Sequence, residues 1–199
     1  MTRTGVVLLA AGSSQRFGND KRLAAVSDAA DPCEPMLLAT IRQIQASGLP
    51  LYVVLRTGDH QWQQELDRLG VAWGASPEAQ QGMGHSLASG IRNNQDWDGW
   101  LIALADMPYI RPRTYRAVAD ALQQHAIVQP VWADPYSGQY HAGHPLGFDR
   151  SLAFELLQCS GDNGACHILR DHAERVFDLI SNDAGILQDI DRPEDLHAG

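Results

Sequence analysis

Short apolar runs alternate along the chain with segments whose apolar residues have helical spacing. The apolar runs predict strands at Val6–Ala10, Leu51–Leu55, Val71–Trp73, Trp100–Ala105, Ile127–Trp132, Val176–Leu179 and Leu187–Ile190. Helical spacing predicts helices at Met36–Ser47, Gln61–Leu69, Gly84–Arg92, Arg113–His125, Leu152–Gln158 and Ala165–His172. Strands that alternate with helices are typical of βαβ units, in which helices cover both faces of the sheet. The pattern therefore predicts an α/β fold with a mostly parallel central sheet and helices on both faces.

The pattern changes in the segment ADPYSGQYHAGHPLGF, residues 133–148, which is rich in turn residues and aromatics. We expect loops here, with an antiparallel ribbon among them. No repeat, low-complexity tract or flexible linker divides the sequence. The simplest interpretation is a single domain over residues 1–199.

Composition and charge narrow the classes of partner. The formal net charge of −9 argues against nucleic acid and against acidic membrane surfaces, because both are bound by basic patches. No apolar run approaches the roughly 18 residues of a membrane span, and Val6–Ala11 is too short for the core of a secretory signal. The 3 cysteines suit a reducing cytoplasm better than a disulfide framework. We expect a cytoplasmic protein.

The first predicted strand ends in a glycine-containing, basic segment, AAGSSQRFGNDKR. In an open α/β sheet, ligands bind outside the carboxyl ends of the strands. Gly12 and Gly18 allow the backbone to approach a ligand closely, while Arg16 and Lys21 can contact phosphate oxygens. The segment matches neither the Walker pattern nor G-x-G-x-x-G. It predicts an anion-binding loop, with a polar strand-to-helix connection as the alternative.

A second candidate is the carboxylate of Asp106, which follows the apolar strand LIALA and precedes Pro108. Magnesium in phosphate-binding proteins takes one or two carboxylates and completes its shell with phosphate and water. Asp106 is placed for that role. The alternative is a turn or helix cap, since aspartate favours such positions.

Several segments, taken together, resemble the nucleotidyltransferases that activate the molybdenum cofactor. The stretch LAAGSSQRFGNDK resembles the family signature L-A-A-G-x-S-x-R-[MF]-G-x-x-K. Five further segments follow in the family's order, namely QGMGHSLASGI, LADMPYI, GHPLGF, GDNGACHIL and DIDRPEDL. The set spans almost the whole chain, so the resemblance is more specific than any one motif.

The resemblance implies a Rossmann-like nucleotidyltransferase fold. It also implies transfer of a nucleoside monophosphate from an NTP to the terminal phosphate of molybdopterin, with Mg²⁺ as cofactor and pyrophosphate as the leaving group. The cytidylyl branch of the family has L-A-A-G where the guanylyl branch has L-A-G-G. Ala11 therefore favours CTP, because its Cβ leaves less room for a purine than glycine would. A molybdoenzyme that receives the product is the implied partner.

The resemblance also implies roles for individual residues. Lys21, Arg16 and Asp106 would be catalytic, and Asp106 and Asp191 would bind the metal. The nucleotide would be held by Ala10, Ala11, Gly12, Ser13, Ser14, Gly18, Gly82 and Ser86. The acceptor would be held by His144, Asp162 and Tyr140. Residues 1–110 would form mainly the NTP-binding half, and residues 130–199 mainly the acceptor-binding half.

The chain departs from the family on the expected acceptor side. Glu34 stands where a lysine is common, Cys166 replaces an arginine, and Tyr140 and His141 stand where arginines often precede G-H-P. These changes remove positive charge. The acceptor and the activity therefore stay open. The alternatives are another pterin or another small acceptor, transfer of a guanylyl group, or a nucleotide-binding protein without catalysis.

Three other constellations offer alternatives. The segment GHSLA resembles the nucleophile elbow of hydrolases, but no strand is predicted immediately before Ser86. The side chains of His141, His144, Cys166 and His167 are of the types that bind zinc, without the spacing of a closed structural site. The aromatic residues Trp132, Tyr136 and Tyr140 can either stack on a pterin ring or cover the core.

Overall fold

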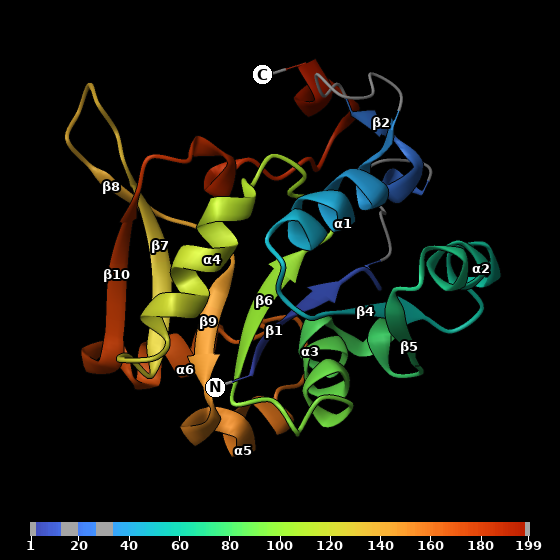
Figure 1. Ribbon diagram of the computed structural model, residues 1–199, viewed down its shortest axis with the longest axis horizontal. Helices are drawn as coiled ribbons and strands as arrows, with labels where there is room; N and C mark the ends of the chain where they lie inside the picture. Colours follow the sequence, from blue (N-terminus) through green and yellow to red (C-terminus); the bar gives the residue numbers. More distant parts are fainter. Residues whose placement is uncertain (1–2, 13–19, 27–33, 198–199) are drawn as a thin grey trace.

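The computed structural model describes residues 3–12, 20–26 and 34–197, and its centre is one 8-stranded sheet (Figure 1). The strand order is β10-β7-β9-β6-β1-β4-β5, with β8 paired to the side of β7. The strands are β1 (Thr4–Leu9), β4 (Leu51–Arg56), β5 (Ala72–Ser76), β6 (Gly99–Leu104), β7 (Ile127–Ala133), β8 (Tyr140–Ala142), β9 (Leu146–Asp149) and β10 (Val176–Ser181). A separate ribbon pairs β2 (Ala25–Val26) with β3 (Glu34–Pro35).

In the 8-stranded sheet, four of the seven described strand pairs are parallel, and the sequence pattern predicts a mostly parallel sheet. Strand β1 lies between β6 and β4 and is parallel to both, with Leu8 opposite Ala103 and Val53. The antiparallel strands are β9, which lies between β6 and β7, and β8, which forms the predicted ribbon with β7. The mostly parallel sheet is confirmed.

Two details of the prediction are wrong. Residues 146–148, at the end of the segment expected to form loops, belong to the strand β9 (Leu146–Asp149) inside the sheet. This strand is only 4 residues long, and pairing with β6 and β7 on its two sides stabilises what its own sequence signals weakly. The predicted strand Leu187–Ile190 is also wrong, because the chain there leaves the 3-10 helix η5 (Ala184–Leu187) and continues without regular structure.

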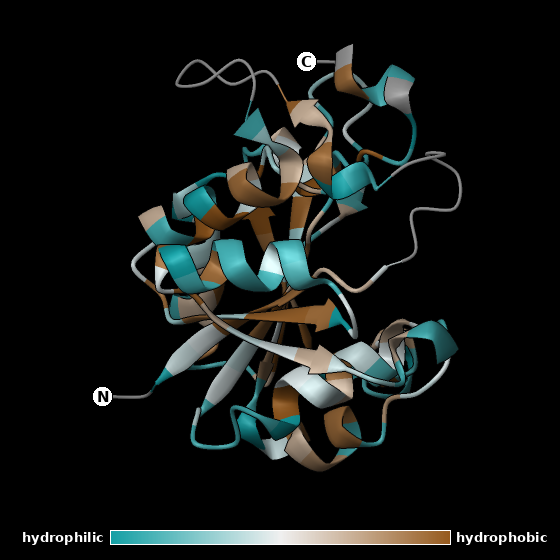
Figure 2. Cartoon of the chain, turned by 90° about the vertical axis from the view of Figure 1, so that its right-hand side faces the viewer, coloured by the Kyte–Doolittle hydropathy of each residue, from teal (hydrophilic) through white to brown (hydrophobic). Residues whose placement is uncertain are grey.

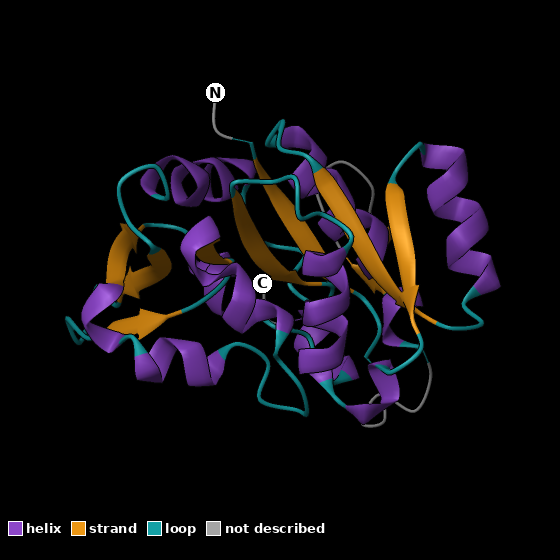
Figure 3. Cartoon of the chain, turned by 90° about the horizontal axis from the view of Figure 1, so that it is seen from below, coloured by secondary structure: helices purple, strands orange, loops and turns teal. Residues whose placement is uncertain are grey.

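The helices lie on both faces of the sheet, as Figure 3 shows from below. On one face are α1 (Met36–Ala46), α2 (His60–Leu69) and α4 (Pro112–Ala121), and on the other are α3 (Met83–Arg92), α5 (Ala153–Leu157) and α6 (Cys166–Asp171). The remaining 3-10 helices are η1 (Lys21–Leu23), η2 (Ala79–Gln81), η3 (Arg150–Leu152), η4 (Ala173–Arg175) and η6 (Pro193–His197). Among the described residues, no helix combines the length and apolar character that a membrane span requires.

Alternation along β1 divides the core into two layers. Val6 and Leu8 pack with α1, α2 and α4, while Val7 and Leu9 pack with α3, α5 and α6. Figure 2 shows the hydrophobic strands between helices whose outer sides are hydrophilic. A strand buried on both faces holds its carboxyl end firmly, and this is where the candidate loop begins.

Candidate active site

A cavity of about 860 Å³ opens where β1 and β6 end and α3 begins. Its lining includes nine of the residues predicted from the sequence: Ala10, Ala11, Gly12, Lys21, Gly82, Ser86, Asp106, Asp162 and Asp191. Segments far apart in the sequence thus meet at one end of the sheet. Arg16, Ser13, Ser14 and Gly18 were also predicted here but lie outside the described residues.

Lys21 lies between two carboxylates in this cavity. Its Nζ is 2.5 Å from Oδ2 of Asp106 and 3.0 Å from Oδ1 of Asp191. Burial by itself lowers the pKa of Lys21, but the charges and hydrogen bonds of Asp106 and Asp191 outweigh it and raise the pKa above its ordinary value. The ammonium is therefore held in its charged form at the end of β1.

Backbone contacts bring the two carboxylates together. Asp106 follows β6, and its carbonyl oxygen accepts a hydrogen bond of 2.9 Å from the N–H of Ile190. This bond holds the C-terminal segment beside the end of β6, so that Asp191 reaches Lys21. The residue before Asp106 is also held in place: the hydroxyl of Thr40 in α1 donates a hydrogen bond of 3.1 Å to the carbonyl of Ala105.

The two carboxylates also fit a magnesium ion. Oδ1 of Asp106 is buried and has no hydrogen-bond partner in the described part of the chain. A buried acceptor without a partner is costly, and coordination of a cation would satisfy it. Since magnesium takes few protein carboxylates and keeps phosphate and water ligands, Asp106 and Asp191 supply a suitable set.

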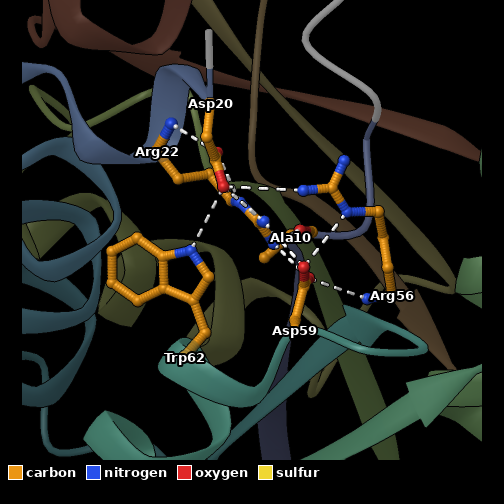
Figure 4. Close-up of polar contacts among 6 residues, drawn as sticks. All are labelled: Ala10, Asp20, Arg22, Arg56, Asp59 and Trp62. Carbon is orange, nitrogen blue, oxygen red and sulfur yellow. Dashed lines mark hydrogen bonds and ion pairs between the residues drawn. The ribbon is translucent and has the colours of Figure 1, made fainter.

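A buried ion network holds the segment that carries Lys21 (Figure 4). The guanidinium of Arg22 pairs with Asp20 through Nε and Nη2 and with Asp59 through Nη1 and Nη2. Nη1 also donates to the carbonyl of Ala10 at 2.8 Å. The ring of Trp62 lies beneath the guanidinium, with its centroid 5.7 Å away. Arg22 thereby fixes the chain beside Lys21 to the end of β1.

The charges in this network are mutually stabilising. Burial by itself raises the pKa of Asp20 and of Asp59, but the hydrogen bonds and charge of Arg22 outweigh it and hold both below their ordinary value. Four residues of this network were not predicted from the sequence: Asp20, Arg22, Arg56 and Asp59. Arg56 and Asp59 lie at and just after the end of the predicted strand Leu51–Leu55, so the strand-end argument used for Asp106 would have found them.

Close backbone packing shapes the wall formed by α3. Gly82 has φ of +125°, and a Cβ there would lie 2.2 Å from the carbonyl carbon of Gly161. The N–H of Gly84 donates to the carbonyl of Gly161 at 2.8 Å. Two predicted motifs, QGMGHSLASGI and GDNGACHIL, are therefore in direct contact, and Asp162 is placed on the cavity wall.

Two predicted acceptor residues do not line this cavity. Tyr140 lies on β8 with 63% of its surface exposed. His144 is largely buried, which lowers its pKa, while the negative charges of Asp106 and Asp189 act in the opposite direction. His144 thus lies within electrostatic reach of Asp106, although it does not line the cavity.

The hydrolase and zinc alternatives do not match the geometry. Ser86 lies inside α3 and not at a strand-to-helix turn, so the nucleophile elbow is absent. In the described ranges, no group of three or more His, Cys, Asp or Glu side chains is arranged to hold a metal ion. That finding includes His141, His144, Cys166 and His167 and argues against the zinc site.

Comparison with known proteins agrees with the fold. The chain is 27% identical over 204 residues to purine catabolism protein PucB of Bacillus subtilis (strain 168), covering 95% of this chain and 92% of PucB. The crystal structure of Rv0371c from Mycobacterium tuberculosis H37Rv superposes with a TM-score of 0.81 at 24% identity, covering 99% of this chain and 96% of that one. The structure of Rv0371c in complex with manganese has a TM-score of 0.76 at 22% identity, covering 100% and 97%. These likenesses to solved structures show the shared Rossmann-like fold.

The family match extends over most of the chain and includes the end of β1, α3 and β6, which frame the cavity. Residues 6–176 match the family described as the MobA-like NTP transferase domain. The family resemblance expected from the sequence is confirmed, and nucleotidyl transfer is the chemistry of this family. The chain belongs to the family of MobA-like NTP transferase domains.

Proposed function

We propose that this protein transfers CMP from CTP to the terminal phosphate of molybdopterin, with Mg²⁺ as cofactor and release of pyrophosphate. The observation that carries the proposal is the placement of Lys21 between Asp106 and Asp191, beside the backbone of Ala11 and Gly12. A cation and two carboxylates at the end of a central strand suit a bound triphosphate and its metal.

Each residue has a task in this reaction. The backbone at Ala11 and Gly12 lies against the nucleotide, and Lys21 neutralises the triphosphate as negative charge develops on it. Asp106 and Asp191 would hold a magnesium ion, which would supply Lewis-acid polarisation of the phosphate. The acceptor phosphate is already an anion, so the reaction needs positioning and charge neutralisation more than a strong base. By family resemblance, Arg16 assists Lys21.

The choice of CTP rests on Ala11. This residue lines the cavity and is 5% exposed, so its Cβ takes up room that a glycine would leave for a larger base. The manganese complex of Rv0371c supports a divalent metal in a protein of this fold.

The acceptor half is proposed to lie within residues 130–199. Asp162 lines the cavity from this half, and His144 lies within electrostatic reach of Asp106. Glu34, which replaces a common lysine, is paired with Arg42 at 3.0 Å and so does not face an acceptor as a free anion. We propose a pterin acceptor and delivery of the product to a molybdoenzyme in the cytoplasm.

A turnover experiment tests the proposal. The protein is incubated with Mg²⁺, molybdopterin and either CTP or GTP, and pyrophosphate release and the pterin dinucleotide are measured by coupled assay and mass spectrometry. We expect a cytosine dinucleotide, in an amount equal to the pyrophosphate and lost on Asp106→Asn. A guanine product would refute the choice of base. Nucleotide binding without turnover on any phosphorylated pterin would refute the enzyme assignment and leave a nucleotide-binding protein.

A further inference from the structure

Three basic side chains line the cavity among the described residues: Lys21, Arg22 and Arg56. They differ in how many donors remain for a ligand. Arg22 is 3% exposed, and all three of its guanidinium nitrogens are engaged by Asp20, Asp59 and a backbone carbonyl. Arg22 is therefore part of the protein framework and has no donor left over for a ligand.

The guanidinium of Arg56, in contrast, is only partly engaged by described residues of the protein. Its side chain is 28% exposed, its Nε donates to Oδ1 of Asp59 at 3.2 Å, and its Nη2 reaches Oδ2 of Asp20 at 3.5 Å. No hydrogen bond from Nη1 to any described residue is found. Figure 4 shows this nitrogen on the side of the guanidinium away from both aspartates. The two carboxylates thus orient Arg56 while leaving donors for a ligand in the cavity.

The charge around Arg56 argues against a second phosphate site. Two guanidinium groups, those of Arg22 and Arg56, face the two carboxylates of Asp20 and Asp59, so the cluster is balanced in charge. A balanced cluster attracts a polyanion weakly. Its remaining donors suit neutral acceptor atoms, such as the ring nitrogen and carbonyl oxygen of a base.

The strand order places Arg56 and Asp106 on opposite sides of the end of β1. Strand β1 lies between β6, which leads to Asp106, and β4, which ends at Arg56. The ends of β6 and β4 are therefore about 10 Å apart. If the phosphates lie at Lys21 and Asp106, as the proposed function requires, a nucleoside of this length would extend past Ala11 toward Arg56 and the start of α3, which also line the cavity.

We propose that Arg56 is a specificity-determining residue that binds the base of the nucleotide by donating to two adjacent acceptors, O2 and N3 of cytosine. The inference rests on the proposed function and names the base contact of the same site. A planar guanidinium donates two parallel hydrogen bonds and matches a pair of neighbouring acceptors. Uracil carries an N–H at N3, and the edges of adenine alternate donor and acceptor, so both match this pair poorly. Guanine presents O6 and N7 as adjacent acceptors, so Arg56 discriminates against uracil and adenine, while the choice against guanine rests on Ala11.

Binding titrations separate the base contact from the phosphate contact. The affinities for CTP, UTP and inorganic tripolyphosphate, each with Mg²⁺, are measured on the wild type, Arg56→Gln and the control Arg68→Gln. Arg68 is an exposed arginine on α2 that pairs with Glu65 outside the cavity. We expect Arg56→Gln to weaken CTP binding by about 10-fold or more and to reduce the preference for CTP over UTP. Tripolyphosphate binding should change less than about 2-fold, which also reports that the variant remains folded.

The outcomes distinguish this inference from the proposed function. Equal losses for CTP and tripolyphosphate would make Arg56 a phosphate ligand or a structural residue and would overturn the inference. An unchanged preference for CTP over UTP in Arg56→Gln would overturn it as well, while the nucleotidyltransferase proposal stands. If the wild type binds neither CTP nor tripolyphosphate, the proposed function fails first.

Discussion

The ammonium of Lys21 lies 2.5 Å from Asp106 and is bound on its other side by Asp191 at 3.0 Å. The pair joins the end of the first strand to a carboxylate 85 residues further along the chain. Lys21 is also the sole lysine of the sequence, so its environment can be followed without interference from other lysine side chains.

We expect Lys21 to react slowly with amine acylating reagents at pH 8. The neighbouring aspartates raise its pKa and leave less of the reactive neutral amine, and CTP with Mg²⁺ should slow the reaction further. Peptide mass spectrometry separates this side chain from the N-terminal amine. Asp191→Asn should accelerate the labelling, and an unchanged rate in that variant would contradict the pairing.

Substitution of Lys21 by methionine should strengthen metal binding in the absence of nucleotide. Without the ammonium, the negative charges of Asp106 and Asp191 face the cation alone, and we expect Mn²⁺ to bind several-fold more tightly by electron paramagnetic resonance titration. Tripolyphosphate binding should weaken in the same variant. The double variant Lys21→Met with Asp106→Asn is the control, and Mn²⁺ binding that persists in it would place the metal elsewhere.

Acid stability should depend on the network around Arg22. The pKa of Asp59 is held below its ordinary value of 3.8, so its stabilising effect is complete above that pH and is lost as the pH falls below it. Asp59→Asn should lower the free energy of unfolding by about 3 kcal/mol at pH 7. It should also flatten the dependence on pH below about 4, as measured by urea denaturation. A slope identical to that of the wild type would show that Asp59 does not titrate in this way.

A single methyl group at Gly82 should disrupt the α3 wall. Gly82→Ala combines an unfavourable φ of +125° with a Cβ that would lie 2.2 Å from the backbone of Gly161. We expect a destabilisation of about 2–4 kcal/mol and a loss of nucleotide affinity. Gly138→Ala is the matched control, because its φ is +69° and its Cβ would meet nothing within 4 Å. Equal effects in the two variants would show that close packing at Gly82 has no importance.

Tyr115→Phe should leave the protein as stable as the wild type or stabilise it by about 1 kcal/mol. The hydroxyl of Tyr115 is buried without a hydrogen-bond partner among the described residues, so its removal relieves a desolvation cost and keeps the ring in the core. Thermal denaturation measures the difference. A fall of several degrees in Tm would indicate that the hydroxyl is bonded in solution, and Tyr52→Phe provides a comparison at a partly exposed tyrosine.

The sequence by itself determined the α/β class and the main positions of the site. Apolar runs such as Val6–Ala10 are buried on both faces, so their pattern is strong and local, and polar residues at their ends mark the ligand edge. This argument identified Gly12, Lys21 and Asp106. The family motifs added Asp191, which no local pattern relates to the first strand.

Only the tertiary structure decided which side chains face one another. Strand β9 is too short to be recognised alone and is stabilised by pairing on both sides. The local sequence does not distinguish Arg22, in the segment after β1, from Arg56, at the end of β4. Burial and five hydrogen bonds nevertheless make Arg22 structural, while Arg56 keeps donors toward the cavity. Partners such as Asp59 come from another element of the fold. Long-range contacts of this kind depend on how the chain packs, and short-range patterning carries no record of them.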